Sequence, residues 1–381
     1  MFDLTPDAIE TRDLIRKVAA ERIAPRADAI DRTGEYPQDM FDLLRELGVF
    51  SLPFPESYGG RDSLLAAAVA TEELGRVCYN TGYLLVVQWT PFGAIMAAGT
   101  DAQQKRYLPG LASGDLRAAF SITEPQSGSD VAGVKTRAEP APGGYRISGA
   151  KIWCTNALVS DFIVLAARTG PERGEINFFI LPTDAEGLTI GPKEDKLGAR
   201  GVPSSPLFLD GVFVPEEARL GEEGKGFRQV MEALALSRPI VGARAVGLAQ
   251  GALDHALAFM ADRKAFDQPL TDFQGLRWML ADMAMQIEAA RGLVYKAAAM
   301  TDAGVRGKEL AQAAAIAKAF SSDVAMKVAT DAVQLFGASG ISNDYPINRY
   351  FRDAKVVQIV EGSNQIQRNI IAKNLLDGVG R

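Results

Sequence analysis

The chain has 381 residues, of which 47% are hydrophobic and 23% charged, so it is too apolar for a disordered protein and long enough for two or three packed domains. Its 41 Lys and Arg against 47 Asp and Glu give a formal charge of -6 without a long run of either sign, which argues against a nucleic-acid partner. No window approaches about 18 uninterrupted apolar residues and the first residues lack a signal-peptide pattern, so we expect no membrane insertion.

Residues 1–115 have the apolar spacing of amphipathic helices. Leu14, Ile15 and Val18 are apolar at three- and four-residue spacing, and Met40 and Leu44 are likewise four residues apart. The pattern breaks at residues 52–60, which are rich in Pro and Gly. We predict an N-terminal α-helical domain over residues 1–115.

Residues 116–225 change to the pattern of short β-strands separated by turn signals. The predicted strands are Arg117–Thr123, Tyr145–Ile147, Phe162–Ala166, Ile176–Leu181, Leu188–Ile190 and Leu207–Val214. No helical pattern lies between them, which favours an antiparallel β-barrel or sandwich over a doubly wound dinucleotide fold.

Residues 226–381 return to helical periodicity in long segments rich in Ala, Leu and Met. The predicted helices are Val230–Arg263, Leu270–Gly304, Gly307–Gly337 and Gln365–Leu376. They predict a C-terminal four-helix bundle. The fold class is therefore α+β multidomain, with a helical domain, a middle β domain and a helical bundle.

Two residue types restrict the chemistry. Cys78 and Cys154 lie far apart without further ligands nearby, which argues against a disulfide framework and a zinc site and fits the reducing cytoplasm. The one histidine, His255, cannot form a di-histidine metal site, and most hydrolase mechanisms lose support. We expect no metal centre.

Several motifs, in order along the whole chain, resemble those of the acyl-CoA dehydrogenases, closest to the short- and medium-chain branch. They are residues 120–130 (FSITEPQSGSD), 149–156 (GAKIWCTN), 262–266 (DRKAF), 334–340 (QLFGASG), 352–355 (RDAK) and 361–363 (EGS). The resemblance implies FAD-dependent α,β-dehydrogenation of an acyl-CoA to the trans-2-enoyl-CoA, with electrons passed to an electron-transferring flavoprotein. It also implies a homotetramer or dimer.

Glu361 is the predicted base for the α-proton. It follows the apolar run 356–360 and precedes Gly362, so its carboxylate is expected at the mouth of an apolar pocket, where burial raises the pKa. The resemblance adds that its backbone N–H helps to hold the thioester oxygen. The alternative is that Glu361 only caps the following helix. Some family members carry the base on an earlier helix, where the only acid here is Glu232.

The resemblance also implies the binding residues. The cofactor-binding set is Phe120, Ile122, Thr123, Ser129, Trp153, Thr155, Arg263, Phe266, Gln274, Gln334, Gly337, Ser363 and Gln365. The segments around Arg263 and Gln334 correspond to a site that is completed across a subunit boundary. The substrate-binding set is Ser129, Arg238 and Gly362. For Trp153 the alternative is an ordinary buried strand tryptophan.

Two bulky residues, Trp89 and Phe92, align with the region that closes the acyl pocket in relatives. They would favour short, branched or cyclic acyl groups, but packing in the core is the favoured interpretation of both residues. Two other functions stay open at this point. One is an acyl-CoA oxidase that uses molecular oxygen, and the other is a non-catalytic helical scaffold of the same fold.

Overall fold

The computed structural model describes residues 4–377. The N-terminal helices are α1 (Pro6–Val18), α2 (Ala27–Thr33), α3 (Gln38–Glu46), α4 (Leu64–Val77), α5 (Tyr79–Ala98) and α6 (Asp101–Ser113). Ser63 caps α4 by accepting a hydrogen bond from the backbone N–H of Ala66 at 3.1 Å. Asp302, from the C-terminal part of the chain, accepts from the N–H groups of Leu64 and Leu65 at 2.7 and 3.0 Å. The start of α4 is therefore anchored to the helical bundle.

The middle domain is built on one eight-stranded sheet within the described residues, in the order β6-β7-β3-β2-β4-β5-β8, with β1 paired to β4. The strands are β1 (Ala118–Ser121), β2 (Arg137–Ala141), β3 (Gly144–Thr155), β4 (Phe162–Arg168), β5 (Ile176–Pro182), β6 (Leu188–Ile190), β7 (Ser204–Pro215) and β8 (Arg219–Leu220).

The expectation of an entirely antiparallel sheet is wrong at two places. Strand β1 lies parallel to β4, and so does β2, which contacts β4 through Arg137 and Arg168. The reason is the route of the chain: β1 enters the sheet from the helical domain beside β4, and no hairpin joins the two. The remaining neighbours pair antiparallel, as expected from their short connections.

The C-terminal helices are α7 (Gly226–Asp262), α8 (Gln274–Asp302), α9 (Gly307–Phe336), α10 (Ile347–Ile359) and α11 (Asn364–Asp377). The helical bundle is confirmed, with α7, α8 and α9 as its long members. Helix α10, which was not predicted, precedes α11, and a short break separates the two. A small hairpin of β9 (Lys264–Ala265) and β10 (Gln268–Pro269) joins α7 to α8.

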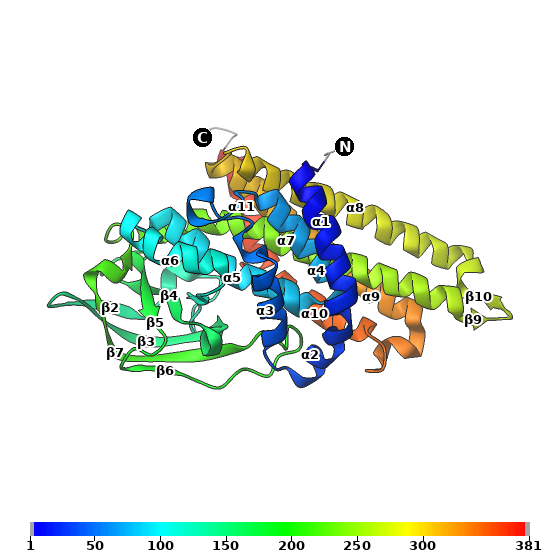
Figure 1. Ribbon diagram of the computed structural model, residues 1–381, viewed down its shortest axis with the longest axis horizontal. Helices are drawn as coiled ribbons and strands as arrows, with labels where there is room; N and C mark the ends of the chain where they lie inside the picture. The colour runs from blue at the N-terminus through cyan, green and yellow to red at the C-terminus, as the bar shows by residue number, and fades with distance from the viewer. Residues whose placement is uncertain (1–3, 378–381) are drawn as a thin grey trace.

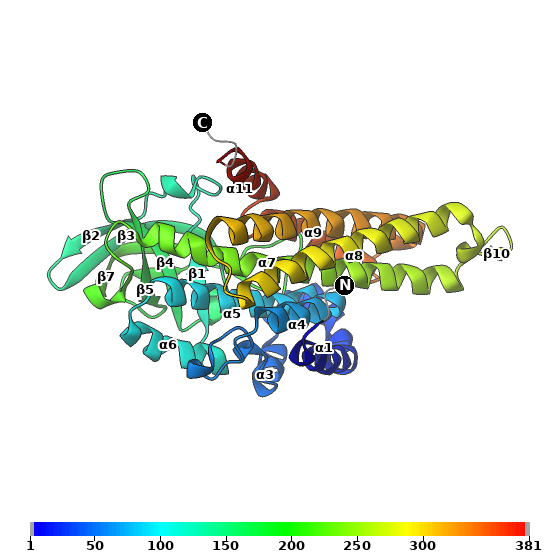
Figure 2. The same cartoon turned by 90° about the horizontal axis from the view of Figure 1, so that it is seen from above.

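The molecule is elongated, with the β domain at one end and the β9–β10 hairpin at the other (Figure 1). Figure 2 shows α7 running along most of this length, with α4 and α5 on one side and α9 on the other. Both faces of α5 are buried, because the helix passes between the bundle and the sheet. A single apolar cluster includes Leu74 of α4, Leu85 of α5 and Val246 of α7. The N-terminal helices and the bundle thus share one core.

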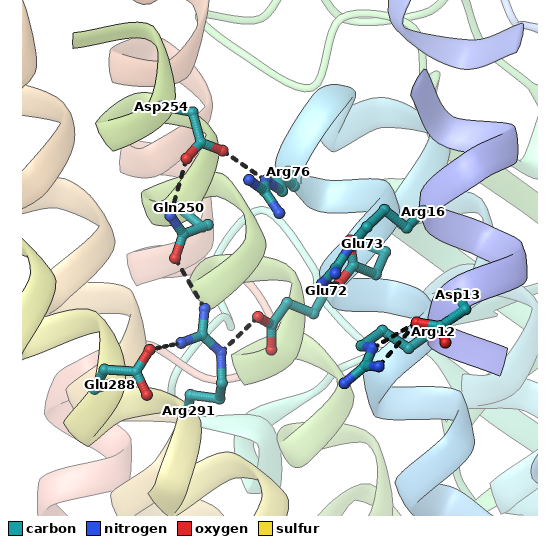
Figure 3. Close-up of polar contacts among 10 residues, drawn as sticks. All are labelled: Arg12, Asp13, Arg16, Glu72, Glu73, Arg76, Gln250, Asp254, Glu288 and Arg291. Carbon is teal, nitrogen blue, oxygen red and sulfur yellow. Dashed lines mark hydrogen bonds and ion pairs between the residues drawn. The ribbon is translucent and has the colours of Figure 1, made fainter. Parts of the chain in front are cut away.

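Charged side chains reinforce this shared core (Figure 3). Arg291 of α8 donates through Nε to Glu72 of α4 at 2.7 Å and through Nη2 to Gln250 of α7 at 3.0 Å. Gln250 in turn donates to Asp254 at 3.0 Å, and Asp254 accepts from Arg76 of α4 at 2.5 Å. Burial raises the pKa of Glu72, while Arg291 opposes that rise. The network fixes α4, and with it α5, against α7.

None of the helices in residues 4–377 combines the length and the apolar character needed to cross a membrane.

Candidate active site

Glu361 lies in the break between α10 and α11. Its φ is 56°, in the left-handed region that costs a non-glycine residue about 1–2 kcal/mol, and the next residue, Gly362, has a φ of 85°. A Cβ on Gly362 would meet Nε2 of Gln367 at 2.7 Å. The left-handed turn therefore favours glycine at 362, and a larger residue would also have to displace the amide of Gln367.

Lys318 of α9 holds this turn. Its buried ammonium donates to the carbonyl oxygen of Gly362 at 2.9 Å and to Oδ1 of Asn364 at 3.0 Å, with a longer contact of 3.4 Å to the carbonyl of Gln358. Burial lowers the pKa of Lys318 to about 7, although the charge of Glu361 opposes this shift. The strained backbone at Glu361 is thus stabilised by the ammonium of Lys318, which donates to three acceptors around the turn. Sequence reasoning missed Lys318, although it is a lone charge in an alanine-rich stretch.

The carboxylate of Glu361 points toward α7. Its Oε2 accepts a hydrogen bond from Oγ of Ser237 at 3.4 Å, and no bond from a backbone N–H of α11 reaches it within the described residues. This arrangement disfavours the helix-capping alternative. Burial raises the pKa of Glu361, while Arg244, Lys318 and Arg238, in that order, act to lower it. A partly buried carboxylate with a raised pKa has the properties of a general base.

A mainly apolar cavity of about 190 Å³ lies near this carboxylate, although Glu361 itself does not line it. It lies between α5 and α7, and Ser237, the hydrogen-bond partner of Glu361, forms part of its wall. Trp89 and Phe92 line it from α5 and are also buried in the core. Trp89 is fixed by a 2.8 Å hydrogen bond from Nε1 to the carbonyl of Phe50. Both residues therefore pack in the core and also line the cavity, and their effect on the acyl group stays a prediction.

The predicted flavin residues of the middle domain come together at one edge of the sheet. The N–H of Ile152 donates to the carbonyl of Thr123 at 2.9 Å, which places the segment after β1 against β3. A bulge in β3 lies between Lys151 and Cys154, and inside it Trp153 has a φ of 59° and is 51% exposed. The alternative of a buried strand tryptophan is wrong, because the bulge turns the indole outward.

A buried ion pair supports this edge. Lys151 of β3 and Glu124 are both almost completely buried, with Nζ and Oε1 2.8 Å apart. Glu124 also accepts from the N–H groups of Lys135 and Thr136 at 2.6 and 3.0 Å. Burial alone would raise the pKa of Glu124, but Lys151 and these donors lower it to about 2. The pair was missed because neither residue stands in a pattern that reveals its partner.

Tyr83 of α5 interacts with both Thr155 of β3 and Glu361. Burial raises the pKa of Tyr83, Arg244 lowers it, Glu361 raises it further, and the hydroxyl of Thr155 lowers it by a hydrogen bond. Thr155 and Glu361 therefore approach the same tyrosine from different domains. Between them lies the part of the molecule where a base and a redox cofactor would have to meet.

Other predicted cofactor residues lie at the far end of the bundle, near the β9–β10 hairpin (Figure 1). Arg263, Phe266 and Gln274 are all exposed there, Phe266 to 90%. Gln334 and Gly337 lie close to this group, because Phe336 stacks on Phe259 near the end of α7 with ring centroids 4.1 Å apart. Within a single chain, these residues at the end of the bundle do not lie beside Trp153 of the middle domain.

The remaining predicted residues divide between two places. Ser363 and Gln365 lie at the start of α11 beside Glu361, and Arg238 is buried on α7, where its Nε has no hydrogen-bond partner in the described residues. Ser129 is exposed in the loop after β1, the strand that contains Phe120, and Ile122 lies at the start of this loop. The side chain of Glu232, the alternative base, lies outside the described residues.

Three family matches cover this architecture. Residues 5–115 match the family described as acyl-CoA dehydrogenase, N-terminal domain, residues 119–212 the middle domain and residues 224–376 the C-terminal domain. The chain belongs to the acyl-CoA dehydrogenase family. It is an enzyme, which removes the scaffold alternative, and its reaction is in general terms the dehydrogenation of an acyl-CoA.

Individual relatives match over nearly their full length. Cyclohexane-1-carbonyl-CoA dehydrogenase of Geobacter metallireducens is 42% identical over 381 residues, with 99% of each chain covered. The solved structure of butyryl-CoA dehydrogenase from Megasphaera elsdenii has a TM-score of 0.95 and 38% identity, covering 99% of this chain and 100% of that one. A chain in the structure described as "Electron transferring flavoprotein of Acidaminococcus fermentans: Towards a mechanism of flavin-based electron bifurcation" also has a TM-score of 0.95 and 38% identity, with 99% of both chains covered.

Proposed function

We propose that this enzyme converts an acyl-CoA to the trans-2-enoyl-CoA with Glu361 as the base. The observation that carries the proposal is the partly buried carboxylate of Glu361, hydrogen-bonded to Ser237 on the wall of the cavity, in a turn held by Lys318. Glu361 takes the proton from the α-carbon, and a hydride leaves the β-carbon, so the two carbons become joined by a double bond. The raised pKa makes Glu361 a stronger base, because a general base is most effective when its pKa lies near the pH at which the enzyme works.

The cofactor of this reaction is FAD, as the family and its flavoprotein relatives support. When bound, FAD accepts the hydride and releases two electrons to a partner. The outward indole of Trp153 and the hydroxyls of Thr123 and Thr155 fit a flat, polar-edged ring system, since an aromatic face can cover the ring and hydroxyls can bond its edge. Phe120, Ile122 and Ser129 complete this set, with Ser363 and Gln365 on the opposite side.

The substrate is held by groups around Glu361. The backbone N–H of Glu361 makes no hydrogen bond within residues 4–377 and is free to donate to the thioester oxygen. Arg238, Gly362 and Ser129 are the further substrate contacts. The cavity of about 190 Å³ favours short, branched or cyclic acyl groups, since an engineered cavity of about 150 Å³ holds one benzene ring.

We also propose that two subunits complete each flavin site. Arg263 and Phe266 are exposed at the end of the bundle opposite the β domain, so a second copy of the chain must supply them to the ring edge near Trp153. A guanidinium at Arg263 suits the flavin diphosphate. Gln274, Gln334 and Gly337 belong to the same set. We expect a homotetramer or dimer and, from two free buried cysteines, a cytoplasmic location.

Flavin bleaching tests this function and its electron acceptor. Purified enzyme with FAD is mixed anaerobically with a panel of acyl-CoA thioesters, and loss of flavin absorbance is expected with at least one of them. Turnover is then expected with an electron-transferring flavoprotein and not with oxygen alone. Rapid oxygen consumption would favour the oxidase, and an enzyme that no acyl-CoA bleaches would contradict the proposal.

Lys318→Met is expected to lower kcat about 10- to 100-fold with a smaller change in KM. Without the ammonium the carbonyl of Gly362 loses its donor, and a shift of about 1 Å in a reacting group costs this much rate. Rapid-mixing flavin reduction measures the effect. Lys355→Met, which removes an exposed lysine from α10, is the control, and equal rates for the two variants would contradict the role of Lys318.

A further inference from the structure

The loop of residues 191–203, which joins β6 to β7, contacts several parts of the candidate site. The N–H of Gly201 donates to Oδ1 of Asn80 on α5 at 2.9 Å, and the N–H of Ala199 donates to Oδ1 of Asp353 on α10 at 2.7 Å. Helix α5 lines the cavity, and α10 leads into the turn of the proposed base. The loop then enters β7, which pairs with β3, the strand of the proposed flavin residues.

Lys196 of this loop donates hydrogen bonds toward β7. Its Nζ donates to the carbonyl oxygen of Val202 and, at 3.2 Å, to Oγ of Ser204. Burial lowers the pKa of Lys196 to about 8, while Asp353 opposes this shift and Lys193 adds to it. The side chain is therefore mainly an ammonium at pH 7, and an ammonium donates hydrogen bonds without accepting any.

The bond from Lys196 fixes the direction of the next one. A hydroxyl has a single proton to donate, and Ser204, only 5% exposed, already accepts from Lys196. Within residues 4–377, the one other hydrogen-bond partner of this hydroxyl is Oγ1 of Thr155, 3.3 Å away across the β3–β7 pair. Ser204 therefore donates its proton to Thr155. The proton of Thr155 itself is left to point elsewhere.

Thr155 accordingly acts as a donor on its other side. Its hydrogen bond lowers the pKa of Tyr83, which is the effect of a bond donated to the tyrosine oxygen. Thr155 lies two residues after the outward-facing Trp153 and belongs to the set that we propose for the flavin. The edge of a flavin ring carries hydrogen-bond acceptors, so a hydroxyl whose proton is already directed away from the sheet suits it.

We propose that Lys196 acts through Ser204 to hold the hydroxyl of Thr155 as a hydrogen-bond donor to the bound flavin. This inference rests on the proposed function. Lys196 is a positioning residue, because it acts on the flavin only through two hydroxyls. Successive hydrogen bonds polarise one another, and a positive charge at the start of the chain favours a flavin that has gained electrons. Lys196 and Ser204 therefore both raise the reduction potential of the FAD.

The test compares Lys196→Met and Ser204→Ala, each loaded with FAD, with the unmodified holoenzyme. Both variants are expected to lower the equilibrium constant for two-electron reduction about tenfold, a fall of about 30 mV in the potential, and to shift the visible flavin absorption. Two matched controls should leave both readouts unchanged. Lys193→Met removes a lysine of the same loop that donates to Gly34 instead, and Ser205→Ala removes a buried hydroxyl that has no partner in the described residues.

The double variant Lys196→Met, Ser204→Ala separates the chain from two independent effects. Its potential should fall no further than that of Lys196→Met alone, because one break already interrupts the chain. Additive shifts would refute the proposal, and so would shifts no larger than those of the controls. Either result leaves the proposed function standing if an acyl-CoA bleaches the unmodified enzyme. An unmodified enzyme that binds no FAD, or that no acyl-CoA bleaches, would overturn both.

Discussion

The Glu361→Gln variant is expected to bind FAD and acyl-CoA yet to reduce its flavin about 10²- to 10⁴-fold more slowly, the range for losing a general base. Glutamine has nearly the same shape and can still accept the hydrogen bond from Ser237, so the turn and the cavity persist. Only the ability to take the α-proton is removed. Single-turnover flavin bleaching measures the loss, and acyl-CoA binding by the variant shows that the site remains intact.

The pH dependence of the same rate separates the base from a structural role. Burial raises the pKa of Glu361 above its ordinary value, and the base acts only when ionised. The rate of the unmodified enzyme should therefore rise as the pH rises through that raised pKa and then level off. Glu361→Gln should lack this rise. Glu309→Gln, on the exposed start of α9, is the control and should keep it. A variant at 361 with the same pH profile as the control would refute the assignment.

Arg291→Met is expected to destabilise the holoenzyme by about 3–5 kcal/mol, the usual cost of leaving one partner of a buried ion pair alone. Glu72 is only 5% exposed, and Arg291 is its 2.7 Å partner across the contact between α4 and α8. The variant would leave a buried carboxylate whose pKa is already raised by burial. Chemical denaturation of the holoenzyme, monitored by helical circular dichroism, measures the change.

Two further variants identify the cause of this loss. Lys327→Met breaks an exposed pair with Asp331 on one helix and is expected to cost no more than about 0.5 kcal/mol. The double variant Glu72→Met, Arg291→Met removes both charges and should recover much of the stability, because no ion is left unpaired. If Arg291→Met is no less stable than Lys327→Met, the network of Figure 3 does not hold α4 to the bundle.

The periodicities in the sequence predict the long helices and most of the strands, but they do not carry the features that depend on distant partners. Helix α10 has buried Ile347, Tyr350 and Val357 at helical spacing. This periodicity is sufficient to predict a helix, but the segment also contains the motif 352–355, on which its interpretation was based. Strand β2 is short, contains Pro140 and has only one fully buried residue, so it lacks an alternating pattern. The parallel pairing of β1 with β4 is a property of the chain's route through space, which local spacing does not encode.

The same limit applies to the candidate site. The segment around Glu361 could be singled out because its motif is local, and the structure gives it a strained turn and a buried carboxylate. Lys318 and Arg244 could not be assigned a role, because each is a cation within an apolar stretch of its helix and its contacts come from distant parts of the chain. A charge inside an otherwise apolar helical face is the signal that could have marked both.

The common core of the N-terminal helices and the bundle has a consequence for recombination between relatives. Leu74 of α4 and Val246 of α7 belong to one apolar cluster that also contains Val164 and Phe178 of the sheet, whereas Ile147 and Val212 belong to a second, smaller cluster within the middle domain. Chimeras that exchange the middle domain would have to match the sheet face that packs in the larger cluster, although the smaller cluster would be transferred intact. Chimeras that exchange the N-terminal helices alone would divide the larger cluster over their whole contact with α7, so the first and last thirds of the chain are best exchanged together although they are far apart in sequence.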